Sequence, residues 1–152
     1  MDESGVNGPF QRENGRAPRG AKIHGVKSGK RSRRTNVVAA LCQGKHYAVR
    51  RYERSTNAVS FEQWFGNVFL PAFPHGQGYT VILDNASHHR RKALKKLARG
   101  KVRILFLPPY SPDYNPIEKS LANMKRFLRD NLRDFFMVGL LIYEYFALRN
   151  LT

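Results

Sequence analysis

The stretch TVILDNASHHRRKALKKLARGKVRILFLP (Thr80–Pro108) decides the fold of this chain. It starts with a β-branched, apolar strand pattern that ends on Asp84. A basic helix pattern follows at His88–Ala98, and a second strand pattern at Val102–Pro108. A strand–helix–strand unit crosses over right-handedly, which makes its two strands parallel. The stretch therefore predicts an α/β domain with a mixed sheet.

Two further strands and a helix are predicted upstream of this unit. The runs Thr35–Cys42 and His46–Glu53 read as strands, and the short break at Gly44-Lys45 predicts a hairpin between them. A helix follows, with Ser55 or Asn57 as its cap. Its apolar residues recur at three- and four-residue spacing, and two prolines end it: Phe61, Trp64, Phe65, Val68 and Phe69, then Pro71 and Pro74.

The overall composition bounds the function. A chain of 152 residues is most simply one domain. Its 27 Lys and Arg against 11 Asp and Glu give a net charge of +16, which points to a nucleic-acid partner without naming an activity. The single cysteine, Cys42, sits in an apolar run, so we expect it to be buried and inert. No signal peptide or apolar run of about 20 residues is visible, so we expect a cytoplasmic protein without a membrane partner.

Basic residues concentrate in two places. Residues 5–35 are rich in Gly, Arg and Lys, and are expected to form an exposed arm or loop. The second concentration is the helix pattern after Asp84. A run of charge is usually just a solvated face, but the large excess here favours contacts to DNA phosphates that position the duplex without reading bases. The candidate DNA-binding residues are Lys27, Lys30, Arg31, Arg33, Arg34, Arg90, Arg91, Lys92, Lys95 and Lys96.

Carboxylates stand at the starts or ends of several predicted elements. Asp84 ends a strand, at the edge where open α/β sheets bind ligands, although capping of the next helix would also explain it. The segment LPPYSPDYNPIEK (Leu107–Lys119) is stiffened by four prolines and presents Glu118 at the start of a helix that runs to about Asn131. A capping box of Asn115 and Glu118 would explain that helix start without any catalysis.

Three motifs taken together resemble a known family. DES near the start, ILDNASHH in the middle and LPPYSPDYNPIEK later, in that order, are similar to motifs of the DDE transposases of mariner-like bacterial insertion sequences. The resemblance extends from Asp2 to about Arg133 and implies an RNase H-like domain, a mixed sheet flanked by helices. It implies that the catalytic, metal-binding residues are Asp2, Asp84 and Glu118. It also implies supporting roles for Asn85, His89 and Asn115.

The same resemblance implies the chemistry. Members of this family cleave DNA and join strands by in-line displacement at phosphorus, with two Mg²⁺ ions (or Mn²⁺) held by the three acids. The stiff approach to Glu118 then serves to aim that carboxylate, because small misplacement costs rate steeply. His89 would contact substrate phosphate or orient a ligand, or else be a surface histidine on a basic helix.

The match also departs from the family pattern. Relatives carry an apolar strand directly before the first aspartate and DNA-binding helices before that strand. We therefore expect an N-terminally truncated domain whose first core strand is missing and whose Asp2 lies on a free end. Residues 1–134 would form the catalytic domain. Residues 135–152 would form a hydrophobic helix that packs on the domain or on a partner.

Two functions stay open at this point. One is a transposase catalytic domain, bound to DNA in the cytoplasm of a bacterium and associated with the nucleoid, as a homo-oligomer or with a full-length transposase. The other is a non-catalytic remnant that binds DNA or interacts with an intact transposase.

Overall fold

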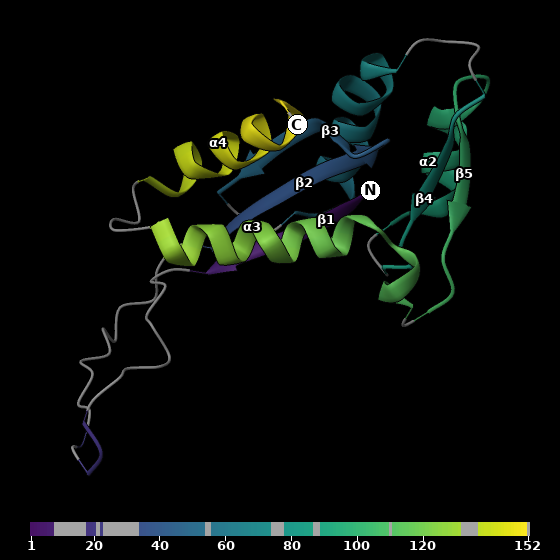
Figure 1. The fold of residues 1–152 in the computed structure, drawn as a ribbon. Helices are drawn as coiled ribbons and strands as arrows, with labels where there is room; N and C mark the ends of the chain where they lie inside the picture. Colours follow the sequence, from purple (N-terminus) through teal and green to yellow (C-terminus); the bar gives the residue numbers. More distant parts are fainter. Residues whose placement is uncertain are drawn as a thin grey trace.

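The computed structural model describes residues 1–7, 18–20, 22, 34–53, 56–73, 78–86, 89–109, 111–131 and 137–151. Within these residues, β1 (Asp2–Asn7), β2 (Arg34–Cys42) and β3 (Lys45–Tyr52) form an antiparallel sheet in the order β1-β2-β3. A second, parallel pair consists of β4 (Thr80–Leu83) and β5 (Arg103–Phe106). Figure 1 shows the two sheets side by side. The predicted α/β class and the parallel strand pair are confirmed.

The hairpin between β2 and β3 is also confirmed, one residue earlier than expected. Its turn residues are Gln43 and Gly44, whose φ angles are 49° and 79°. Two successive positive φ angles are typical of the type I′ turn, whose twist matches that of the strands it joins.

Helix α1 (Ala58–Trp64) begins as predicted, because the side chain of Asn57 accepts a hydrogen bond from the backbone N–H of Ser60 at 2.9 Å. It continues as a π-helical segment, η1 (Phe65–Phe69), and a 3₁₀ turn, η2 (Leu70–Ala72). Trp64 donates its indole N–H to the carbonyl of Ala48 at 2.7 Å, which fixes the helix against β3.

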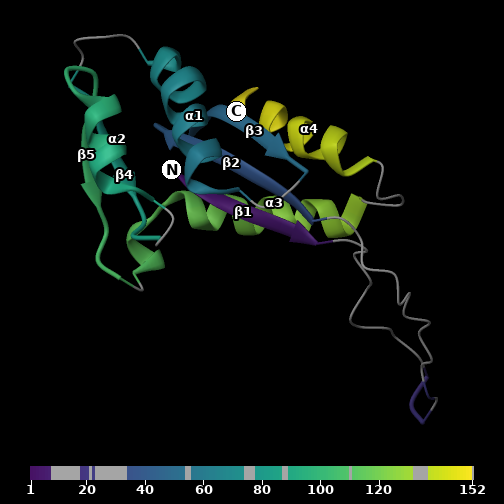
Figure 2. The same ribbon diagram turned by 180° about the vertical axis from the view of Figure 1, so that it is seen from behind.

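Strand β2 is buried on both faces. Val38 and Ala40 pack with the aromatic residues of α1 and η1, and with β4. Val37 and Ala39 face the opposite side, toward α3 (Ile117–Asn131) and α4 (Val138–Leu151). Figures 1 and 2 show α3 on one side of the β1–β3 sheet, with β1 and β2 in front of it when seen from behind. The alternation of side chains along one strand thus gives the domain its two cores.

The C-terminal helix α4 docks onto the start of β3. The side-chain oxygen of Asn150 accepts the backbone N–H of His46 at 2.7 Å, and its amide nitrogen donates back to the His46 carbonyl at 2.9 Å. The His46 ring lies 2.7 Å from the hydroxyl of Ser120 on α3. Burial lowers the pKa of His46, and the nearby charge of Arg149 acts in the same direction. The C-terminal helix therefore packs on the domain. Apolar side chains at its start and along it stay exposed: Met137 just before the helix, and Leu140, Tyr143, Leu148 and Leu151 within it.

Three sequence-based expectations need correction. The basic helix α2 (Arg91–Ala98) begins after His89, so His89 does not belong to it, while His88 lies outside the described residues. The predicted arm at residues 5–35 includes residues of β1 and β2, while residues 8–17, 21 and 23–33 lie outside the described part of the chain. The expectation that Asp2 lies on a free end is wrong, because Asp2 pairs with Ala39 of β2 and is only 6% exposed.

Within the part of the chain that the structure describes, no helix is long and apolar enough to cross a membrane.

Candidate active site

Asp84 follows the last residue of β4 and is held by a histidine. The Nδ1 atom of His89 lies 3.0 Å from Oδ1 of Asp84, and the His89 side chain is almost completely buried. The ring of Phe61 on α1 packs against the His89 ring, with 4.2 Å between centroids and 31° between planes. His89 is therefore not a surface histidine of a basic helix. It connects the end of β4 to the aromatic core.

Glu118 lies in the first turn of α3, at the end of a series of tight turns. The N–H of Asn115 donates to the carbonyl of Pro112 at 2.9 Å, and the N–H of Glu118 donates to the carbonyl of Asn115 at 3.0 Å. Asn115 itself is 3% exposed. The proline-rich segment thus turns into the helix over a few residues, which fixes where α3 begins and where the Glu118 side chain starts.

Asp84 and Glu118 line one cleft with a volume of about 450 Å³. Its wall is formed by the proline-rich segment and by residues after β4: Asn85, Ala86, Leu107, Pro108, Pro109, Ser111, Pro112 and Asn115. Prolines of this segment thus stand in the wall of the same cleft as Asp84 and Glu118. Asn85 and Asn115, singled out from the motifs, also line the cleft.

Asp2 comes from a third element, the start of β1. The pKa of Asp2 is raised from 3.8 to about 8, mainly because the carboxyl group is buried. The charge of Glu118 and a side-chain hydrogen bond to it raise the pKa further, and the charge of Asp84 adds a smaller effect. The N–H of Glu3 donates to Oδ1 of Asp2 at 2.7 Å and acts in the opposite direction. The fold therefore brings Asp2 and Glu118 into contact and Asp84 within electrostatic reach.

The chemistry of these side chains suits a hard divalent cation. Carboxylate oxygens are the ligands that Mg²⁺ prefers, and it usually takes only a few of them. Among the described residues, no group of three or more His, Cys, Asp or Glu side chains already stands as a metal-binding cluster. The pKa of Asp2 is raised first by burial and then by the negative charge of Glu118, and a bound cation would offset that repulsion between the two carboxylates. The carboxylates of Asp2, Asp84 and Glu118 are thus of the chemical type that binds Mg²⁺.

Glu3 is a site residue that the motifs did not single out. Burial raises the pKa of its carboxyl group, and its charged neighbours include His89, Asp84 and Arg34. Alternation along β1 explains this position, since Asp2 faces α3 and Glu3 faces α1. The acidic pair at residues 2–3 was visible in the sequence, but the two faces of β1 were not.

The candidate DNA-binding residues divide into groups. Arg90 makes two hydrogen bonds to Glu62, at 2.6 and 2.7 Å. Arg91 bonds to Asn85 and lies over the Phe106 ring, 4.8 Å from its centroid. Both arginines are therefore engaged within the protein.

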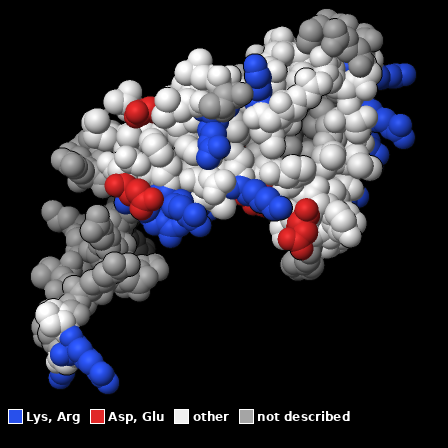
Figure 3. All heavy atoms as spheres, in the orientation of Figure 1, with Lys and Arg blue, Asp and Glu red and all other residues white. Residues whose placement is uncertain are grey.

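The remaining candidates differ in where they lie. Arg34 belongs to β2 and bonds to Asn36 at 2.9 Å. The lysines of α2 are exposed: Lys92, Lys95 and Lys96. The other candidates fall outside the described residues: Lys27, Lys30, Arg31 and Arg33. Figure 3 shows further Lys and Arg side chains along the edge that α3 forms. Lys119, which directly follows Glu118 on α3, is exposed.

Residues 1–136 match the family described as DDE superfamily endonuclease. The chain belongs to this family. The matched residues include Asp2, Asp84 and Glu118, and they extend over both sheets and α3.

Two solved structures share the fold of this chain. The chain is similar to the protein in the "Crystal structure of the Mos1 Strand Transfer Complex", with a TM-score of 0.74 and 19% identity over 95% of this chain and 45% of that one. It is also similar to the "Mos1 transposase paired-end complex with left transposon end", with a TM-score of 0.69 and 19% identity over 96% and 46%. The chain therefore has an RNase H-like fold.

A curated relative matches a shorter part. The "Uncharacterized protein y4pE/y4sA" of Sinorhizobium fredii (strain NBRC 101917 / NGR234) is 39% identical over 56 residues, which is 37% of each chain. This DDE superfamily endonuclease therefore spans less than half the length of the relatives it matches.

Proposed function

We propose that this chain is the catalytic domain of a DNA transposase, which cleaves a DNA strand and joins its end to another strand. The observation that supports the proposal is that Asp84, which follows β4, and Glu118 of α3 line one cleft. Asp2 of β1 lies close enough to Glu118 and Asp84 for their charges to raise the pKa of its carboxyl group. The family to which the chain belongs consists of endonucleases.

In this proposal Asp2, Asp84 and Glu118 hold divalent metal, Mg²⁺ or Mn²⁺. The ion would supply Lewis-acid stabilisation of the negative charge that develops on oxygen during displacement at phosphorus. The protein itself supplies position. His89 holds the Asp84 carboxylate at 3.0 Å, and the Phe61 ring limits the movement of His89. The prolines of the cleft wall fix the start of α3 and therefore the reach of Glu118.

The DNA would lie across the cleft and along the basic surfaces beside it. The exposed side chains of α2 include Lys92, Lys95 and Lys96. Arg91, the first residue of this helix, bonds to Asn85, which lines the cleft. Lysines in such positions would bind phosphates and set the register of the duplex without reading its sequence.

The decisive experiment is a nicking assay on supercoiled plasmid in Mg²⁺ or Mn²⁺. We expect nicking by the wild-type chain and its loss in Asp84→Asn. The matched control is Asp113→Asn, which removes an exposed acid of the same proline-rich segment that does not line the cleft. Equal nicking in excess chelator, or equal loss in both variants, would show that the proposed metal site is not the source of cleavage.

A second candidate function is a non-catalytic module that binds DNA or pairs with an intact transposase. It is favoured by the lack of a preassembled metal cluster among the described residues, and by the exposed apolar side chains of α4. This module would bind DNA with a steep dependence on salt and no sequence preference, yet would not nick at any metal concentration. Its association with a full-length relative would be measured by analytical ultracentrifugation.

A further inference from the structure

One half-buried carboxylate beside the active site has no part in the proposed metal site. Glu3 of β1 lies opposite Val38 of β2, on the face of the sheet that packs against α1. Asp2, the residue before it, points to the other face, toward α3. Taking a carboxylate out of water is costly unless positive charges or hydrogen-bond donors surround it. The neighbours of Glu3 therefore indicate what it does.

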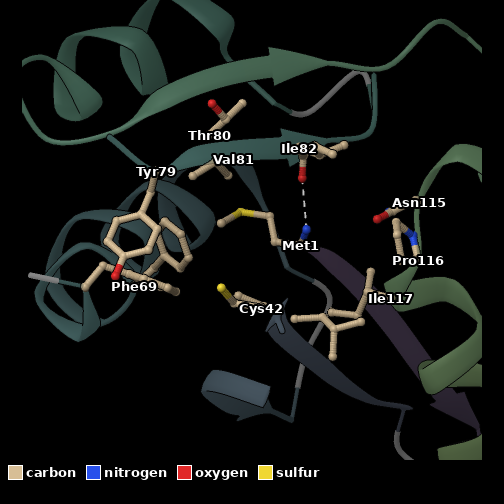
Figure 4. Close-up of a pocket in the computed structure, with 13 residues that line it drawn as sticks. Met1, Cys42, Phe69, Tyr79, Thr80, Val81, Ile82, Asn115, Pro116 and Ile117 are labelled. Carbon is tan, nitrogen blue, oxygen red and sulfur yellow. Dashed lines mark hydrogen bonds between the residues drawn. The ribbon is translucent and has the colours of Figure 1, made fainter. Parts of the chain in front are cut away.

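The start of β1 lies beside the end of β4. Figure 4 shows Met1 in a pocket between β2 and β4, where its amino nitrogen donates to the carbonyl of Ile82 at 2.9 Å. Ile82 precedes Asp84 by two residues, and Glu3 follows Met1 by two. Glu3 and Asp84 thus come from neighbouring parts of two sheets. Cys42 lines the same pocket and is half-buried there, not fully buried as its apolar run predicts.

The groups around Glu3 include the histidine that holds Asp84. Burial raises the pKa of the Glu3 carboxyl group, the charge of His89 lowers this pKa, and the charge of Asp84 raises it. A hydrogen bond to the Thr56 side chain and the charge of Arg34 lower it further. Glu3 therefore lies within electrostatic reach of His89 and contacts the hydroxyl group of Thr56.

Side chains of β2 hold the other neighbours of Glu3 in place. Asn36 donates from Nδ2 to the Thr56 hydroxyl at 3.4 Å, and its Oδ1 accepts the Nε–H of Arg34 at 2.9 Å. The Arg34 guanidinium lies against Gly5, the next residue of β1 on the same face as Glu3. A Cβ atom on Gly5 would overlap this guanidinium. Glycine at this position thus leaves room for a positive charge near Glu3.

His89 holds a carboxylate that would otherwise be mobile. The Asp84 side chain is 39% exposed, and its Oδ1 atom lies 3.0 Å from Nδ1 of His89. The Phe61 ring packs on the His89 ring, with 31° between planes. A stacked ring can still rotate in its own plane, so stacking alone does not fix the direction of Nδ1. Because the edge of an aromatic ring carries partial positive charge, a carboxylate near that edge restricts this rotation.

We propose that Glu3 is a positioning residue of the active site, which acts on Asp84 through His89. In this proposal Glu3 contacts neither metal nor DNA. It restricts the His89 ring, and the ring restricts the Asp84 carboxylate, while Thr56 and Arg34 keep Glu3 in place. The effect of Glu3 on cleavage rests on the proposed function, but its coupling to His89 does not.

Thermal melts at pH 7, without metal or DNA, test the coupling. The variants are Glu3→Gln, His89→Asn and the double variant. In the wild-type chain Glu3→Gln removes an attraction to His89, whereas in the His89→Asn chain that attraction is already gone. We therefore expect the double variant to melt at least about 2 °C above the temperature that the two single effects predict by addition.

The matched control for these melts is Glu53→Gln. Glu53 forms an ion pair with Arg51 at 3.4 Å, and its side chain is 64% exposed. Its effect should add to that of His89→Asn, because residues without shared partners act independently. Additive effects of Glu3→Gln and His89→Asn as well would overturn the proposal.

A second measurement needs no substitution of His89. The nuclear Overhauser effect between the His89 and Phe61 rings reports the orientation of His89, and it should change in Glu3→Gln. His46 is an internal control, since its ring lies 4.7 Å from the Phe146 ring in the other core. The same effect between these two rings should not change. An unchanged signal between His89 and Phe61 would overturn the proposal.

The nicking assay then measures the consequence for cleavage. Loss of a residue that supports a metal-binding carboxylate costs about 10–100-fold in metal affinity or activity. Because Glu3 acts through a second residue, we expect Glu3→Gln to nick about tenfold more slowly than the wild-type chain. Glu53→Gln should stay within about twofold of the wild-type rate. Equal rates in Glu3→Gln and the wild-type chain would contradict the positioning role. If the wild-type chain does not nick, the proposed function fails, and the melts and ring signals still decide whether Glu3 acts on His89.

Discussion

The contact between Phe61 and His89 gives a prediction that separates stability from positioning. Phe61 is 1% exposed, and its ring stacks on His89 with 4.2 Å between centroids. Phe65, in the next turn, is 0% exposed and stacks on Phe69 at 5.2 Å. Both residues belong to the same core, but only Phe61 reaches the histidine that holds Asp84.

Replacement by leucine should destabilise the fold at both positions. Phe65 loses one ring pair, with Phe69, and Phe61 loses two, with Trp64 and His89. With about 0.5–1.5 kcal/mol for each pair and a repacking cost of up to about 1.5 kcal/mol, we expect Phe65→Leu to lose about 0.5–3 kcal/mol of unfolding free energy and Phe61→Leu about 1–4.5 kcal/mol. A protein of this size should then melt at a temperature that is lower by about 2–4 °C for each kcal/mol lost. Thermal unfolding followed by circular dichroism measures this.

The nicking assay should distinguish the two variants. Phe61→Leu frees the His89 ring and so loosens Asp84, and we expect about a tenfold lower rate at a temperature where both variants are folded. Phe65→Leu should retain the wild-type rate within about twofold, because it leaves the His89 ring in place. Equal rates in the two variants, at equal stability, would refute the idea that Phe61 acts through His89.

Three other predictions follow from the site and from the surface. Saturating Mg²⁺, at about 100 times its dissociation constant, should stabilise the chain by about 2.7 kcal/mol in thermal melts, and Glu118→Gln should remove this effect. Because the folded-state pKa of His46 is lowered, the unfolded chain binds more protons as the pH falls through about 6.5. His46 should therefore contribute a decrease in the free energy of unfolding from pH 7 to pH 5, while Asp2, whose pKa is raised to about 8, contributes an increase over the same range. In urea titrations at the two pH values, lowering the pH should favour the folded state more in His46→Gln than in the wild-type chain. Replacing Lys92, Lys95 and Lys96 by glutamine should reduce the slope of log K for DNA against log salt by about 0.9 for each lysine that contacts a phosphate; an unchanged slope would place the DNA elsewhere.

Much of the secondary structure was readable from local patterns. The cap at Asn57, the β-branched run before Asp84 and the prolines before α3 each act over a few residues, so their effect is encoded locally. The boundaries were less accurate where competing signals overlap. The helix after Asp84 was expected from His88, but it begins at Arg91, because His89 turns inward to Asp84 and the Phe61 ring instead of continuing the helix.

The sequence by itself determined the strand–helix–strand unit that carries Asp84, because this unit depends on residue type and on short-range spacing. The choice of Asp2, Asp84 and Glu118 as site residues came from the resemblance of three motifs to a known family. Tertiary structure decided the rest. It brought Asp2 close to Glu118 and packed the buried His89 ring against Phe61. It also paired Arg90 with Glu62 and formed the pocket between β2 and β4. The physical reason is that these contacts join residues far apart in the chain, so that packing of whole elements, and not local preference, brings them together.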